Sequence, residues 1–235
     1  MYRDEVPAPI ANTTLLYAAC SACLMGLALW VFIVEAPPFF SDGWSEQTMV
    51  DAVSSGTISP GLSNSSKLAY LFDCRVAMTS FTGRAQPTSV HQAIASRCLS
   101  DADSMTLVSP QFAVAWHTGA LAAAMLQDWN GMNERLRRAY DNGRYELWQA
   151  ELRVDLVEGN ADRIEPDVWP RHLDDLRLLL RYDVGRLFLV ARYHALPQLR
   201  QRIDLLVFDL ADPDRIRFQN MAARAEKERL RLNGR

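Results

Sequence analysis

Apolar residues follow two different patterns along this chain of 235 residues. From Leu15 to Val34 they occupy every helical face, and no charged residue occurs between Glu5 and Glu35. A helix of roughly 20 such residues is long enough to cross a hydrocarbon core of about 30 Å. From Ser66 onward, apolar residues recur three and four positions apart, which is typical of amphipathic helices. The pattern predicts an all-α protein in which one transmembrane helix precedes a helical domain.

The same pattern divides the chain into four segments. We expect a cytoplasmic tail over residues 1–14, the transmembrane helix over 15–34, a juxtamembrane segment and linker over 35–65, and one all-helical domain over 66–235. Within the third segment, Ser45 is a suitable cap for a short helix to Ser54. Residues 55–66 are rich in Gly, Ser, Pro and Asn, which indicates a connection with little to bury.

Turn residues set the expected helix boundaries in the domain. The expected helices are 66–83, 88–100, 111–127, 132–140, 146–158, 171–196, 199–210 and 213–230, with a loop over 101–108. The apolar run from Val184 to Ala195 is too short and too charged for a second membrane span, because it contains Arg186 and Arg192. We therefore expect it to be a core helix.

The charges flanking the apolar run predict its orientation. Arg3 precedes it, whereas neither Lys nor Arg occurs from Glu35 to Ser66. Positive charge is retained on the cytoplasmic side of a membrane, so the N-terminus should be cytoplasmic and the main domain exported. A cleaved signal peptide would have a shorter apolar core and a small-residue cleavage site, and this chain matches neither.

Two cysteines, Cys74 and Cys98, fall in the domain that we expect to be exported. An isolated pair in an oxidising compartment can form a disulfide. Two buried free thiols fit the sequence equally well, so both states stay open. Cys20 and Cys23 lie inside the apolar run, where a redox role is not expected.

Composition and motifs contain no catalytic signature. The net charge is −3 and the pI is about 5.8, so there is no basic footprint for nucleic acid. The four histidines are dispersed, without the i, i+4 pair of a helical metal site. His117 is expected to be partly exposed, and the acidic pairs Asp174–Asp175 and Glu165 with Asp167 to lie on solvated faces. We predict no catalytic residue, no cofactor and no metal, and a chain that is not an enzyme.

Two sets of residues are candidates for binding. On the helices over 111–143, Trp116 and the cluster Arg135, Arg137 and Arg138 could contact a protein partner, and the arginines could also contact an anionic sugar. In the membrane helix, small residues form one line on which another helix could approach closely; they are Ala18, Ala19, Ala22 and Gly26.

Residues 111–143 resemble one tetratricopeptide unit, a helical hairpin of about 34 residues. With Trp116 at the family's tryptophan, Gly119 and Ala120 fall at its small-residue pair and Leu136 at its large apolar position. The chain departs from the pattern at several positions: Ala123 replaces an aromatic residue, Met132 an alanine and Arg144 a proline. The resemblance implies a tetratricopeptide-like fold.

The succession of membrane helix, alanine-rich hairpin and leucine-rich C-terminal helices resembles small membrane-anchored proteins that accompany exopolysaccharide or O-antigen gene clusters in alphaproteobacteria. This resemblance implies a single-pass inner-membrane protein with a periplasmic domain. It also implies an accessory role in assembly or export of an envelope polysaccharide, through a protein partner in the envelope and contact with the polysaccharide. Two other functions stay open: a polysaccharide- or peptidoglycan-modifying enzyme, and an accessory protein of envelope signalling or division.

Overall fold

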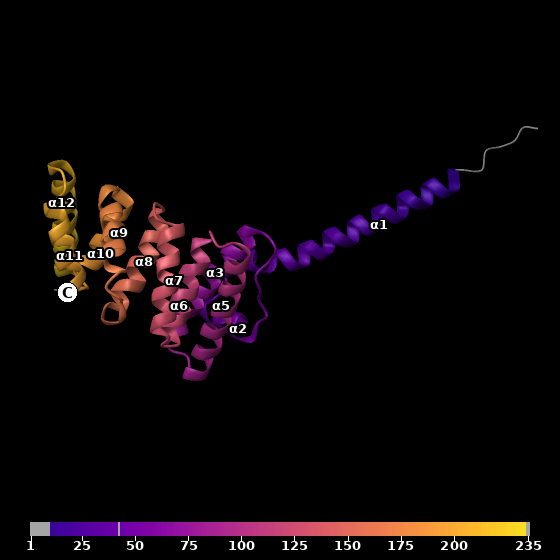
Figure 1. Ribbon diagram of the computed structural model, residues 1–235, viewed down its shortest axis with the longest axis horizontal. Helices are drawn as coiled ribbons and strands as arrows, with labels where there is room; N and C mark the ends of the chain where they lie inside the picture. The colour runs from indigo at the N-terminus through magenta and orange to yellow at the C-terminus, as the bar shows by residue number, and fades with distance from the viewer. Residues whose placement is uncertain (1–9, 42, 234–235) are drawn as a thin grey trace, which may run out of the picture.

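Helix α1 extends away from a stack of shorter helices (Figure 1). The computed structural model describes residues 10–41 and 43–233, and α1 spans Ile10–Glu35. It begins earlier than the expected boundary at residue 15, and residues 1–9 of the expected tail lie outside the described part. From Leu15 to Glu35 the helix is long and apolar enough to cross a membrane, and none of it is buried against the rest of the chain. The predicted order of one membrane-length helix and a helical domain is confirmed.

The first part of the stack comprises η1 (Pro37–Phe39), α2 (Glu46–Ser55), α3 (Asn64–Thr79), α4 (Phe81–Arg84) and α5 (Thr88–Val108). Ser45 caps α2, since its Oγ accepts a hydrogen bond from the Thr48 N–H at 3.1 Å. Met49, Val50 and Val53 of α2 are buried in the same core as α3 and α5. The predicted short helix after Ser45 is therefore present, and it packs into the core of the domain rather than lying in a separate juxtamembrane segment.

The middle of the stack is formed by α6 (Ala113–Met125), α7 (Trp129–Asn142), α8 (Leu147–Gly159), η2 (Ala161–Arg163) and α9 (Trp169–Arg181). Helix α6 packs against α5 on one side and α7 on the other, which is why its alanines are buried on both faces. Ala115 and Ala122 belong to the core shared with α5, while Ala120 and Ala123 belong to the core shared with α7. Small side chains at the crossings allow this close packing.

The stack ends with α10 (Asp183–Tyr193), α11 (Pro197–Phe208) and α12 (Asp212–Asn233), at the opposite end from α1 (Figure 1). The apolar run expected to be a core helix is α10, in which Leu189 and Val190 are buried. The expected single helix over 171–196 is wrong, because the chain turns at Tyr182 between α9 and α10. Gly185 allows this tight turn, since a Cβ there would lie 2.4 Å from the Leu179 carbonyl oxygen.

A second correction concerns residues 101–108, which form the last two turns of α5 rather than a loop. Asp101 and Asp103 face neighbouring helices there. Asp101 accepts a hydrogen bond of 2.5 Å from the Tyr70 hydroxyl of α3, and Asp103 pairs with Arg135 of α7. These partners stabilise a helical segment that polar composition alone does not identify.

Two covalent or polar links fix the end of the domain nearest α1. Cys74 of α3 and Cys98 of α5 form a disulfide with a Cα–Cα distance of 5.9 Å, so the structure has the bridged of the two states that the sequence leaves open. The Glu35 carboxylate at the end of α1 accepts hydrogen bonds from the backbone N–H groups of Leu62 and Ser63, at 2.7 and 3.1 Å. These bonds tie the membrane-length helix to the start of α3. No strand occurs in residues 10–41 or 43–233.

Candidate functional site

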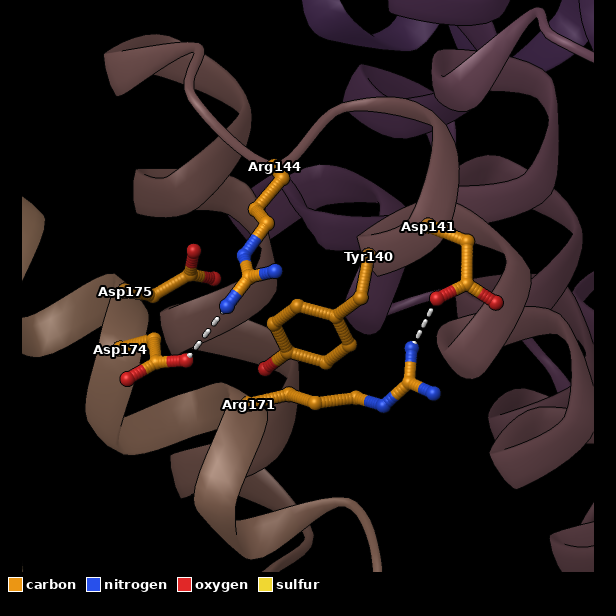
Figure 2. A pocket seen from close by; sticks show the side chains of 6 residues that line it. All are labelled: Tyr140, Asp141, Arg144, Arg171, Asp174 and Asp175. Carbon is orange, nitrogen blue, oxygen red and sulfur yellow. Dashed lines mark hydrogen bonds and ion pairs between the residues drawn. The ribbon is translucent and has the colours of Figure 1, made fainter.

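A pocket of about 310 Å³ opens between α7 and α9, next to the connection from α7 to α8 (Figure 2). Local sequence places its lining. Helix α7 ends at Asn142, with Gly143 as its C-cap, so Tyr140 and Asp141 lie in its last turn. Helix α9 starts with Pro170 in its first turn, so Arg171, Asp174 and Asp175 lie in its first two turns. The lining residues are Tyr140, Asp141, Arg144, Arg171, Asp174 and Asp175.

The rim of the pocket consists of two ion pairs that join α9 to the end of α7 and to the connection between α7 and α8. Arg144 donates a hydrogen bond of 3.2 Å to Asp174, and Arg171 pairs with Asp141 (Figure 2). The Arg144 and Asp174 side chains are 61% and 45% exposed. Such exposed pairs contribute roughly 0–1 kcal/mol to stability. The rim ion pairs can therefore open at little cost, and their side chains can bind a ligand instead.

Behind the rim lies a buried ion pair between Arg153 of α8 and Asp175 of α9. The guanidinium donates to both carboxylate oxygens at 2.8 Å and to the Gly143 carbonyl at 3.0 Å. The two side chains are only 1% and 3% exposed. Burial raises the pKa of Asp175, and the bidentate contact with Arg153 opposes that rise. The prediction that Asp175 lies on a solvated face is wrong, because α8 covers it.

Tyr140 forms the centre of the pocket. Its ring lies between the Arg144 and Arg171 side chains (Figure 2), and the Arg153 guanidinium lies 4.8 Å from the ring centroid. The residue is 3% exposed, yet its hydroxyl has no hydrogen-bond partner among the described residues. Burial raises the pKa of Tyr140 well above 10, and the nearby Asp175 charge adds to the rise. The hydroxyl is therefore protonated at neutral pH and can both donate and accept.

Two histidines of the domain are buried, and one of them departs from expectation. His117 is 5% exposed rather than partly exposed, because α8 covers it, and its Nε2 lies 3.1 Å from the Leu152 carbonyl oxygen. Burial lowers its pKa to about 4, so it is neutral at pH 7. His172 is fully buried, and its Nε2 lies 2.7 Å from Glu158, whose other oxygen accepts from Arg202 at 2.7 Å. This group links α8, α9 and α11.

The predicted arginine cluster is divided between two roles. Arg135 donates two hydrogen bonds to Asp103 at 2.8 and 2.9 Å, and Arg137 pairs with Asp167 and Glu165. Burial within these pairs leaves only Arg138 as an exposed member. The acidic residues Glu165 and Asp167 thus hold a neighbouring helix hairpin in place.

The remaining predicted binding residues do not join this pocket. Trp116 is half-buried on α6, and its Nε1 donates a hydrogen bond of 2.6 Å to the Pro110 carbonyl. The small residues of α1 are exposed, and a Cβ added at Gly26 would meet no atom within 4 Å; the others are Ala18, Ala19 and Ala22. The structure brings none of these residues together with the arginine cluster.

The chemistry of the pocket is that of hydrogen bonding and charge pairing. Within the described residues, no group of three or more His, Cys, Asp or Glu side chains could hold a metal ion. Sequence reasoning missed Tyr140, Asp141 and Arg171 as site residues. One signal was present: partners in these ion pairs recur about one hairpin apart, as in Arg144 with Asp174, which are separated by 30 residues.

No protein-family model, curated protein or solved structure matches this chain. The proposed function therefore rests on the fold and on the geometry of the pocket.

Proposed function

We propose that this chain is a membrane-anchored interaction protein of the bacterial envelope rather than an enzyme. In this proposal α1 holds the protein in the inner membrane, and the helical domain faces the periplasm as a scaffold for assembly or export of an envelope polysaccharide. The observation that carries the proposal is a stack of helical hairpins that follows a membrane-length helix in the chain (Figure 1). Stacked hairpins expose an extended surface, which repeat proteins use to bind other proteins.

Ion pairs between alternate helices support the scaffold interpretation. Residue pairs separated by 30–37 positions connect α5 with α7, α7 with the segment just before α9, and α8 with α10. Acidic side chains with catalytic potential, such as Asp175 and Glu158, are engaged by arginines in these links.

The free end of the stack supports a protein partner. Leu205 and Phe208 of α11 are 74% and 80% exposed, and Ile216 of α12 is 53% exposed. Phe208 also lines a cavity of about 480 Å³, together with Val207 of α11 and Phe218 of α12. Exposed apolar clusters of this kind mark protein-binding surfaces, and this one lies at the end of the stack farthest from α1 (Figure 1).

A photo-cross-linking experiment in intact cells tests the proposal. A photo-reactive amino acid replaces Phe208 in one version of the tagged full-length protein and Leu107 in another. Leu107 is a matched control because it is 84% exposed but belongs to α5, in the part of the stack near α1. We expect position 208 alone to cross-link to a component of a polysaccharide assembly or export system. Cross-links of equal yield at both positions, or to no envelope protein, would contradict the proposal.

A further inference from the structure

The pocket between α7 and α9 contains a polar group that the fold leaves without a partner. The Tyr140 hydroxyl is buried, and no described residue bonds to it. A buried polar group without a hydrogen bond destabilises the folded state, because it has given up its bonds to water. This cost is removed if a bound molecule supplies an oxygen at that position. The ring lies between the Arg144 and Arg171 side chains (Figure 2). Both side chains are partly exposed, so a molecule reaches the hydroxyl when they turn aside.

The charges that line the pocket cancel once Arg153 behind it is included, which restricts the class of ligand. Arg144 and Arg171 are matched on the rim by Asp174 and Asp141, and Asp175 is matched by Arg153. Arg177 lies outside the lining and shares Asp174 at 3.0 Å. A small anion or cation would leave one of these charges uncompensated. A neutral molecule with several hydroxyl groups would find both donors, from the guanidinium groups, and acceptors, from the carboxylates.

The size and the rim energetics agree with such a ligand. A volume of about 310 Å³ is at the lower end of small-molecule sites, which run from roughly 300 to 1,000 Å³. The Arg144 and Asp174 side chains are 61% and 45% exposed, so both can turn toward hydroxyl groups at little cost. The pocket has room for one sugar ring, and the neighbouring sugars of a polysaccharide would lie in solvent.

We infer that this pocket binds one neutral sugar residue of an envelope polysaccharide, with the Tyr140 hydroxyl bonding a sugar oxygen and the rim arginines and aspartates holding neighbouring hydroxyls. This assignment rests on the proposed function and names the ligand of its scaffold. Asp175 is a positioning residue in this site, because its carboxylate is already engaged by Arg153.

Binding to defined sugars tests the inference directly. The full-length protein is purified in a detergent without a sugar headgroup, and saturation-transfer NMR measures binding of neutral methyl glycosides, galacturonate and inorganic phosphate. We expect the neutral glycosides to bind the native protein. Tyr140→Phe and Asp174→Asn should each weaken that binding about tenfold, the effect of losing one well-formed hydrogen bond. Tyr182→Phe, at an exposed tyrosine outside the pocket, should bind as the native protein does.

Thermal unfolding of the same variants separates ligand binding from a structural role. Tyr140→Phe should unfold at the same temperature as the native protein or higher, because its hydroxyl has no partner within the fold. The inference is overturned if no neutral glycoside binds, if only galacturonate or phosphate binds, or if Tyr140→Phe binds normally or unfolds at a clearly lower temperature. If the native protein binds no neutral glycoside but position 208 still cross-links to an envelope component, this inference alone is refuted. If the glycosides bind but position 208 gives no such cross-link, the proposed function is refuted and the sugar site stands.

Discussion

The adjacent residues Asp174 and Asp175 provide an internal comparison of an exposed and a buried ion pair. Asp175 pairs with Arg153, and the two side chains are 3% and 1% exposed. Asp174 pairs with Arg144, and those side chains are 45% and 61% exposed. Replacing either aspartate by asparagine removes one charge and almost no volume. The difference between the two variants therefore reports the effect of burial.

The expected magnitudes follow from what each substitution leaves behind. Asp175→Asn leaves the Arg153 guanidinium buried without a carboxylate, with the Gly143 carbonyl as its remaining short contact. Breaking a buried pair in this way costs about 3–5 kcal/mol, whereas an exposed pair contributes roughly 0–1 kcal/mol. With a urea m-value of about 2 kcal/mol/M, Asp175→Asn should lower the unfolding midpoint by about 2 M and Asp174→Asn by at most about 0.5 M.

Urea unfolding followed by far-ultraviolet circular dichroism measures both shifts on the full chain. The double variant Arg153→Met with Asp175→Leu completes the comparison, because it removes both charges and leaves side chains that can pack in the same space. It should be more stable than Asp175→Asn alone. Equal midpoints for the two asparagine variants would refute the reasoning. So would a double variant whose loss of unfolding free energy exceeds the sum of the losses in its two single variants.

Three further changes probe other parts of the molecule. Reduction of the Cys74–Cys98 disulfide, whose cysteines are separated by 24 residues, should lower the free energy of unfolding by about 3.5 kcal/mol by loop entropy; calorimetry with and without reductant checks this, and an unchanged midpoint contradicts it. His117 has a folded-state pKa of about 4, below its ordinary value of 6.5. Its contribution to the free energy of unfolding is therefore fully present above pH 6.5 and is lost as the pH falls toward 4. The loss amounts to about 3 kcal/mol, and a His117→Gln variant should show a flatter pH dependence in urea titrations; parallel curves would count against it. Replacing Ala22 and Gly26 by leucine should weaken recovery of a partner in membrane pull-downs if α1 packs against another helix, and unchanged recovery shows that α1 only tethers the domain.

Local patterns predicted the elements that depend on local physics. The apolar run after Leu15 and the helix cap at Ser45 are both observed, because hydrophobicity and capping act within a few residues. The alanine-rich segment near Ala120 forms α6 within the predicted helix over 111–127. These features require no knowledge of distant residues.

The errors arise where a distant helix decides the outcome. Asp103 lies in a segment that looked like a loop, yet Arg135, 32 residues away, pairs with it on a helix. Asp175 appeared to be solvated, yet Arg153, 22 residues away, covers it. The pocket around Tyr140 is assembled in the same way, since its two sides come from separate hairpins. Periodicity within one helix contains no information about such partners.

In the proposed function, α1 anchors the chain in the membrane, and the helical domain lies on the side of the membrane opposite the cytoplasm. Alkaline phosphatase fused after Arg235 tests this claim, because the enzyme acquires its disulfides and its activity only outside the cytoplasm. We predict an active fusion of full length that remains in the membrane fraction. An inactive fusion would show that the helical domain lies in the cytoplasm, which contradicts the proposed orientation. An active fusion released into the soluble fraction would identify α1 as a cleaved signal sequence.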